Sequence, residues 1–378
     1  TVNNLSTAAA LNPTAKQNFD VLTYSGDGAA GSRALTGLSF KPDFVWIKGR
    51  SYSISHLLYD NVRGAGASKS LVANGTNAEG GAGDNATFGY LESFDTNGFS
   101  IFGGSDVNNG YVNKNSATYV AWCWKAGGAA SSNTDGTITS SCSVNASYGF
   151  SVVTWTGQGS GTANIGHGLS SAPKFIFVKA LTGSVGWTVG HDSIGWTKRL
   201  KLNGNDVEST SSNYWYDTAP TSSVFTSGAN NVNNTFVAYC WSEIAGFSKF
   251  SGYTGTGSSG QAITGLGFKP RFVLIKRTDT IENWHIFDSE RGGTKSLFPD
   301  LANAEVTDGA RSITFADDGF TLGTQGGINA SGGTYIYAAY AATTGDAVGI
   351  DSLVDTPTNG DPADDTGSGN QVTGNYCT

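Results

Sequence analysis

The stretch GLSFKPDFVWIK, residues 37–48, decides the fold because the chain repeats it. It returns as GLGFKPRFVLIK at 265–276 and, more loosely, as GLSSAPKFIFVK at 168–179. Each copy places a short apolar run directly after a proline, and such runs predict β-strands that are buried on both faces. The prolines, Pro42, Pro173 and Pro270, are 131 and 97 residues apart. We therefore expect an internal repeat with three copies.

The repeat extends in both directions from this stretch. Each copy is preceded by a strand pattern that ends in a glycine turn: FDVLTYSGDG (19–28), FSVVTWTGQG (150–159) and FSKFSGYTGTG (247–257). It is followed by YDNVRG (59–64), HDSIG (191–195) and FDSERGG (287–293). Each copy then closes with TYVAWCWKAGG (118–128), TFVAYCWSEIAG (235–246) or TYIYAAYAA (334–342). Units of about 100 residues have the size of one β-sandwich domain.

The sequence thus predicts an all-β protein with three tandem β-sandwich-like units. Its expected parts are an N-terminal arm (1–17), repeat one (18–126), a linker (127–148), repeat two (149–245), repeat three (246–345) and an acidic connector (346–378). We expect this connector to lead to a further domain, and no amphipathic helix of useful length is apparent.

Composition separates this chain from several classes of protein. Among 378 residues, 20 Phe, 15 Tyr and 9 Trp supply the aromatic surface that disordered chains lack. The formal charge is −8 and no Lys/Arg cluster occurs, which argues against a nucleic acid partner. No apolar run has the length of a membrane span, so membrane insertion is not expected.

No pattern indicates a cofactor or a metal. Cys123 and Cys240 occupy the same place in two repeats, and Ala339 takes that place in the third, which indicates a small buried apolar position. Cys142 and Cys377 belong to no recognisable motif, and a disulfide between them is an alternative that the sequence does not decide. GDGAAG (26–31) and GTGSSG (255–260) match a dinucleotide fingerprint, but strand patterns follow them where a helix is required, so we expect turns. The histidines, His56, His167, His191 and His285, have no metal-binding spacing.

A lysine and an aspartate recur together in each repeat. The lysines that end the repeated strand are Lys48, Lys179 and Lys276, and the acids downstream are Asp60, Asp192 and Asp288. We expect each pair to form a structural ion pair between adjacent strands. Glycoside hydrolysis needs two carboxyl groups at a defined separation, and one recurring acid per repeat does not supply them. An acid–base role for His191 beside Asp192 is the less favoured alternative.

Some aromatic residues lie near predicted loops and are candidate ligand contacts. Trp46, Trp122, Trp124, Trp155 and Trp241 lie in repeat strands and are expected in the core. A sugar-binding surface combines aromatic faces with carboxylates and amides. The candidates for such a surface are Trp187, Trp284 and, from the run NYWYD, Tyr214, Trp215, Tyr216 and Asp217. Packing between repeats is the alternative role for these residues.

Long phrases of the chain resemble a repeated domain of tailed bacteriophages, often marine ones. The resemblance rests on FKPDFVWIK, SHLLYDNVRG, GFSVVTWTG, DTAPTSSVFTSG, GFSKFSGYTGTG and the ending DSLVDTPTNG…GNYCT, which is similar to a connector into a SPRY-like, lectin-like domain. It implies a non-enzymatic virion protein, assembled in the host cytoplasm, in an external tail fibre or spike. It also implies a homo-oligomer, with a trimer favoured, that contacts other virion proteins and host surface polysaccharide. A capsid-surface fibre or decoration protein, a polysaccharide depolymerase and a bacterial surface protein are the alternatives.

Overall fold

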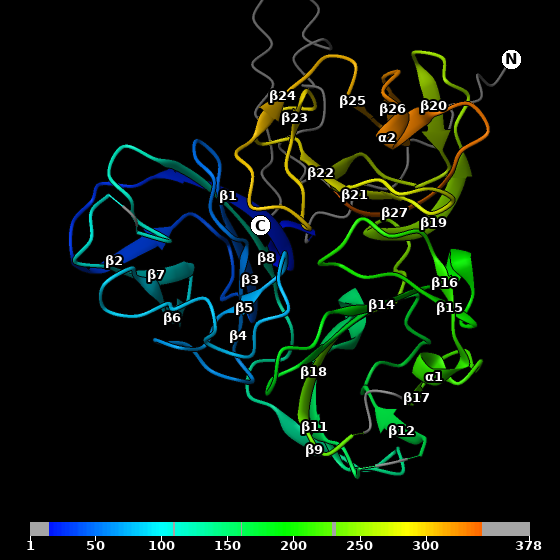
Figure 1. Ribbon diagram of the computed structural model, residues 1–378, viewed down its shortest axis with the longest axis horizontal. Helices are drawn as coiled ribbons and strands as arrows, with labels where there is room; N and C mark the ends of the chain where they lie inside the picture. The colour runs from blue at the N-terminus through cyan, green and yellow to red at the C-terminus, as the bar shows by residue number, and fades with distance from the viewer. Residues whose placement is uncertain (1–14, 109, 160, 229–231, 342–378) are drawn as a thin grey trace, which may run out of the picture. The chain divides into compact units, whose positions relative to one another are not determined.

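The computed structural model describes residues 15–108, 110–159, 161–228 and 232–341 (Figure 1). Of the described residues, 43% lie in strands and 5% in helices, so the predicted all-β class is confirmed. The helices are short: α1 (Ser212–Trp215), α2 (Gly326–Asn329) and the 3-10 helices η1 (Ala15–Gln17), η2 (Ala146–Tyr148) and η3 (Asp192–Ile194). None of the described helices is long and apolar enough to span a membrane. The connector 346–378, with Cys377, lies outside the described residues, as does most of the N-terminal arm.

Each repeat contributes one main antiparallel sheet, and the sheets share a strand order. Repeat one has the order β1-β8-β3-β4-β5, with β1 (Phe19–Ser25), β3 (Phe44–Gly49), β4 (Leu57–Asp60), β5 (Leu71–Val72) and β8 (Thr118–Trp124). Repeat three has the order β19-β27-β21-β22, with β19 (Ser248–Thr254), β21 (Pro270–Arg277), β22 (Trp284–Asp288) and β27 (Thr334–Ala341). In both sheets the repeated apolar strand lies beside the closing strand.

The main sheet of repeat two carries two additional strands. Its order is β14-β13-β18-β11-β10-β9, with β9 (Ser131–Asn133), β10 (Ser140–Asn145), β11 (Phe150–Thr156), β13 (Phe175–Ala180), β14 (Thr188–His191) and β18 (Thr235–Trp241). Strands β9 and β10 come from residues 127–148, the segment whose sequence predicts a linker. They extend the sheet beyond β11, where the first and third sheets end at β1 and β19.

Smaller sheets accompany the main ones. Repeat one has β2-β7-β6, from β2 (Gly31–Thr36), β6 (Tyr90–Asp95) and β7 (Gly98–Gly103). Repeat two has β12-β17, from β12 (Ala163–Gly166) and β17 (Val224–Ser227), and also β15-β16, from β15 (Lys198–Arg199) and β16 (Ser209–Thr210). Repeat three has β20-β26-β25 and β23-β24, from β20 (Gln261–Thr264), β23 (Lys295–Ser296), β24 (Val306–Thr307), β25 (Ile313–Ala316) and β26 (Gly319–Leu322). The glycine runs at 26–31 and 255–260, which match a dinucleotide fingerprint, connect β1 to β2 and β19 to β20. They are turns between strands, as predicted.

The repeated apolar strands are buried on both faces, as their sequence predicts. In β3, Phe44 and Trp46 enter a core that includes residues of all three repeats, whereas Val45 and Ile47 enter a second core within repeat one. Successive side chains of a strand point to opposite faces, so one apolar run serves both cores. Cys123 enters the second core of repeat one and Cys240 that of repeat two, and both are fully buried free thiols. Cys142 is also a buried free thiol.

Aromatic side chains from equivalent strands meet in the shared core. Trp124, Trp241 and Tyr340 occupy the same place in the three closing strands, and Trp124 lies 6.1 Å from Trp241 and 5.5 Å from Tyr340 between ring centroids. Phe272 of repeat three lies 5.8 Å from the same tryptophan. The three repeats therefore bury their aromatic faces against one another. All described residues belong to one compact unit, which ends at Gly345, and the boundaries between repeats stay predictions.

Candidate functional site

The register of the sheets separates the lysines and acids that the sequence appears to pair. Phe44 lies opposite Asp60 and Ile47 opposite Leu57, so Lys48, one residue further, lies at the other end of the β3–β4 hairpin. In repeat three, Phe272 lies opposite Asp288, whereas Lys276 lies opposite Trp284. The predicted pairs Lys48–Asp60 and Lys276–Asp288 are therefore wrong. Each aspartate is the last residue of its strand and each lysine the second-to-last of its own, and antiparallel strands end at opposite edges of the pair.

The register also shows that Asp192 is not the counterpart of the other two acids. Phe175 lies opposite His191, so His191 occupies the place of Asp60 and Asp288. The predicted Lys179–Asp192 pair is also wrong. The Asp192 side chain is 51% exposed, and its Oδ2 atom lies 3.9 Å from the Nζ atom of Lys174 instead. The Nδ1 atom of His191 accepts a bond from the Ser193 N–H, and its Nε2 atom donates to the Tyr337 carbonyl of repeat three. Burial lowers the pKa of His191 to about 4, so the imidazole is neutral at pH 7.

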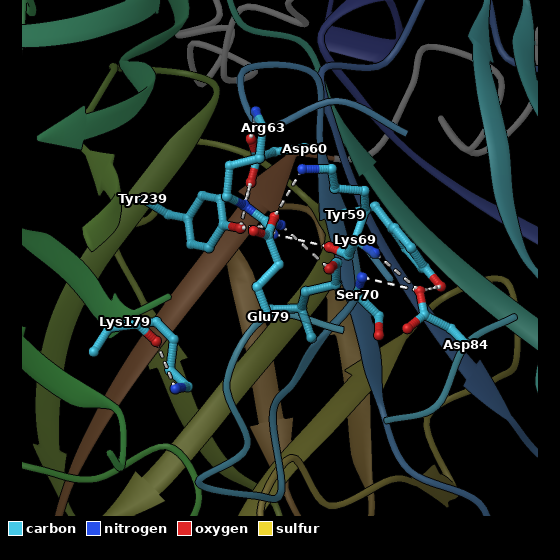
Figure 2. Close-up of polar contacts among 11 residues, drawn as sticks. Tyr59, Asp60, Arg63, Lys69, Ser70, Glu79, Asp84, Lys179 and Tyr239 are labelled. Carbon is cyan, nitrogen blue, oxygen red and sulfur yellow. Dashed lines mark hydrogen bonds and ion pairs between the residues drawn. The ribbon is translucent and has the colours of Figure 1, made fainter. Parts of the chain in front are cut away.

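Asp60 forms a buried ion pair with Arg63, as Figure 2 shows. Arg63 Nε lies 2.5 Å from Asp60 Oδ2, and the Arg63 side chain is only 3% exposed. The Tyr239 hydroxyl of repeat two donates to the same carboxylate oxygen over 2.8 Å. Arg63 Nη1 donates to Glu79 Oε1 at 2.9 Å. The network therefore bonds repeat one to repeat two in a setting where each buried charge has a partner.

A matching network bonds repeat three to repeat one. Arg291 Nε lies 2.6 Å from Asp288 Oδ2, and both side chains are fully buried. Trp122 of repeat one donates its Nε1–H to Asp288 over 2.9 Å. Glu305 accepts from Arg291 and receives two bonds from Arg50 of repeat one, at 2.9 and 3.0 Å. Bidentate pairs of this kind are stronger and more specific than single charged hydrogen bonds.

A recurring glutamate, which was not predicted from the sequence, lies at each of the three contacts between repeats. The backbone N–H of Glu79 donates to Leu181 O, that of Glu208 to Thr278 O and that of Glu305 to Arg50 O. Each glutamate follows an Asn or Asp by five residues, and those side chains, on Asn74, Asn203 and Asp300, accept from the backbone N–H of His56, Trp187 and Trp284. The Asx-to-Glu spacing is the signal that could have revealed this element.

These contacts close a cycle among the three repeats. Trp187 of repeat two donates its Nε1–H to Val72 O of repeat one, and Trp284 of repeat three donates to Lys201 O of repeat two. Lys48 of repeat one completes the cycle by donating to Ala302 O of repeat three at 3.2 Å, as Lys179 does to Thr76 O at 3.4 Å. Each repeat therefore contacts both others.

The recurring lysines are buried, and none of them forms a direct ion pair with a carboxylate of the described residues, which makes the stability of the fold depend on pH. Burial lowers the pKa of Lys48 to about 7, and those of Lys179 and Lys276 to about 8. A lysine whose folded-state pKa lies below its unfolded value binds fewer protons in the folded state. Its destabilising contribution is therefore fully present below the folded pKa and is removed as the pH rises toward about 10.4, the value of a free lysine.

We expect Lys276→Met to stabilise the protein at pH 6 by up to about 3 kcal/mol, because methionine carries no charge to desolvate. The gain should shrink as the pH rises from 8 to 10, because the wild-type lysine is then neutral. Urea unfolding of the wild type and of Lys276→Met at several pH values measures this difference in the free energy of unfolding. A gain that does not change with pH would contradict the argument. Lys201→Met, at a side chain that is 41% exposed, is the matched control and should show little effect.

The structure separates the predicted aromatic candidates into buried and exposed residues. Trp187, Trp215 and Trp284 are at most 1% exposed, so their ring faces are not available to a glycan. Interpreting these three as ligand contacts is wrong: Trp187 and Trp284 pack in the core shared by the repeats, as the alternative role predicts, whereas Trp215 packs in the second core of repeat two. Tyr216 is 55% exposed and Asp217 is also exposed, while Tyr214 lies 3.8 Å beneath the Arg199 guanidinium. A ligand-binding role for Tyr214, Tyr216 and Asp217 stays a prediction.

A cleft of about 530 Å³ opens between repeats one and two. Repeat one contributes Arg63, Lys69 and Glu79, which belong to the network in Figure 2. Asp84 orders this segment by accepting from the backbone N–H groups of Lys69 and Ser70. The opposite wall consists mainly of Ser and Thr residues on or next to β9, β10 and β11, with two buried aromatic residues: Ser132, Thr139, Ser140, Ser141, Thr154, Thr156, Trp155 and Phe236. We take this cleft as the candidate functional site.

One known protein family matches almost all of the repeated region. A family model described as a domain of unknown function (DUF7483) matches residues 14–343. The chain belongs to the DUF7483 family. The DUF7483 match begins before repeat one and ends two residues after β27 of repeat three, which agrees with the interlocked contacts of the repeats. No curated protein matches the chain. Within the described residues, no group of three or more His, Cys, Asp or Glu side chains could hold a metal ion.

Proposed function

We propose that this DUF7483 chain is a structural and adhesive component of a bacteriophage virion, in a tail fibre or spike that attaches to host surface glycan. The observation that carries the proposal is the use of its buried charges. The networks around Asp60 and Asp288 bond one repeat to another, and their members have few groups left for chemistry. Three interlocked repeats suit a part that must keep its structure outside a cell.

The cleft supports a hydroxyl-bearing ligand. Its wall presents Ser and Thr side chains, which both donate and accept hydrogen bonds as sugar hydroxyls do. The charges of Arg63 and Lys69 are balanced by those of Asp60 and Glu79. With a formal charge of −8 on the chain, a nucleic acid is a poor partner.

The composition of the cleft favours binding over hydrolysis. Glu79 is the one carboxylate among its described lining residues, because Asp60 lies fully buried beneath Arg63. Glycoside hydrolysis in most families needs two carboxyl groups on either side of the scissile bond. The proposal therefore includes no enzymatic activity. It includes a homo-oligomer in contact with other virion proteins, assembled in the host cytoplasm and carried on the outside of the particle.

Retention of purified bacterial surface polysaccharides tests the proposal. The chain is immobilised and offered a panel of capsular and O-antigen polysaccharides, and the eluted polymer is sized. We expect at least one polysaccharide to be retained with its length unchanged. A shortened polymer would overturn the non-enzymatic assignment, and no retention across the panel would overturn the adhesive one.

A further inference from the structure

Two features shape the cleft at the contact between repeats one and two, and the first separates this contact from the one between repeats three and one. At the contact between repeats three and one, Arg50 fills the corresponding space and binds Glu305 through both carboxylate oxygens. Leu181 stands in the place of Arg50, and it accepts the Glu79 backbone N–H as Arg50 accepts that of Glu305. Glu79 is accordingly 22% exposed, whereas Glu305 is 11% exposed. An aliphatic residue in place of arginine leaves this space open.

The second feature is the hairpin of β9 and β10, which only repeat two adds to its main sheet. Ser132 lies opposite Ser141, and Ser141 lies opposite Thr154 on β11. Directly opposed residues of antiparallel strands have Cβ atoms about 4.5–5.5 Å apart on the same face. The three hydroxyls thus form a row across the sheet, on the wall of the cleft.

The Glu79 carboxylate lines the same cleft, and among the described residues only its Oε1 atom has a charged partner. Its contacts with Arg63 Nη1 and Lys69 Nζ both involve Oε1, at 2.9 and 3.6 Å. Oε2 is therefore left to accept a hydrogen bond from a ligand. The Lys69 side chain, which is 38% exposed, offers a donor at the same edge. These two groups form no excess of either charge, which disfavours a strongly anionic or cationic ligand.

We propose that this cleft binds a segment of neutral oligosaccharide, with the Ser132–Ser141–Thr154 row and the Glu79 Oε2 atom as hydrogen-bonding partners of its hydroxyls. The inference rests on the proposed function, because it gives the glycan a location. A volume of about 530 Å³ lies within the usual range for small-ligand sites.

Three variants of the full chain test the location. Ser132→Trp places a bulky side chain at an exposed position of the cleft wall, and the double variant Ser141→Ala/Thr154→Ala removes two hydroxyls. Ser209→Trp, at an exposed position of β16, is the matched control for the tryptophan. Each variant is compared with wild type by retention of a neutral polysaccharide from the panel and by urea unfolding. We expect Ser132→Trp to abolish retention and the double variant to weaken it about tenfold, as loss of one or two hydrogen bonds predicts.

The outcomes separate this inference from the proposed function. Normal retention by Ser132→Trp and by the double variant would overturn the cleft as the site while leaving the adhesive function standing. Retention confined to acidic polysaccharides would overturn the neutral ligand class. Loss of retention in Ser209→Trp as well would show that the effect is not local, and would also count against the site. No retention by the wild-type chain would overturn the proposed function itself.

Discussion

Replacing Arg291 by methionine is expected to lower the free energy of unfolding by about 3–5 kcal/mol, the usual cost of breaking a buried ion pair by removing one partner. Asp288 and Arg291 are both fully buried, and the guanidinium bonds to Asp288, Glu305 and the Ile286 carbonyl. Without it, Asp288 keeps the Trp122 Nε1–H but no compensating charge. Urea unfolding of wild type and Arg291→Met measures the loss.

The control for this prediction is Lys201→Met, which removes a pair with Asp206 whose side chains are 41% and 52% exposed. Exposed pairs contribute about 0–1 kcal/mol, so this change should be small. A double-mutant cycle of Arg291→Met with Trp122→Phe then tests the contact between repeats. Groups that share one network show coupling of about 0.5–3 kcal/mol, and purely additive effects would contradict a shared network.

Trp124→Ala is expected to cost about 3–5 kcal/mol, as is usual when a large buried aromatic residue is truncated. The ring is 3% exposed and contacts aromatic rings of all three repeats, including Trp241 and Tyr340. The loss should therefore appear in the whole repeated region, although the substitution lies in repeat one. Thermal unfolding followed by circular dichroism should show one transition at a lower temperature.

A different result would indicate separate domains. If repeat one folded alone, Trp124→Ala would lower only part of the unfolding signal, and the rest would melt at the wild-type temperature. Phe94→Ala is a useful comparison, because Phe94 lies in the second core of repeat one rather than in the shared core. It should also lower a single transition if the repeats unfold together.

The sequence predicts the strands well because the pattern of their side chains reflects two buried faces. FVWIK in repeat one and its counterparts form β3, β13 and β21, and the small residue at Cys123, Cys240 and Ala339 lies in a core in every repeat. These features depend on local periodicity, which a single sequence contains. The turns at 26–31 and 255–260 follow from strand patterns on both sides for the same reason.

The partners of charged side chains could not be predicted in the same way, because they depend on register and on contacts between repeats. A recurring Lys and a recurring Asp suggest a pair, yet antiparallel pairing places Lys48 and Asp60 at opposite ends of a hairpin. In repeat two the register places His191, and not Asp192, at the position that Asp60 and Asp288 occupy in the other repeats. Trp187 and Trp284 have loop-like surroundings in the sequence, but neighbouring repeats cover them. The cleft likewise depends on Leu181 and the β9–β10 hairpin, whose importance is visible only when the repeats are superimposed.

Differential scanning calorimetry of the chain tests the central claim, that three repeats with one shared core fold as a single unit. Two-state unfolding gives equal calorimetric and van't Hoff enthalpies. We predict one transition in which the two enthalpies agree, because each repeat contacts both others through buried hydrogen bonds and aromatic rings. Separate transitions, or a calorimetric enthalpy about three times the van't Hoff value, would contradict it by showing that the repeats unfold independently.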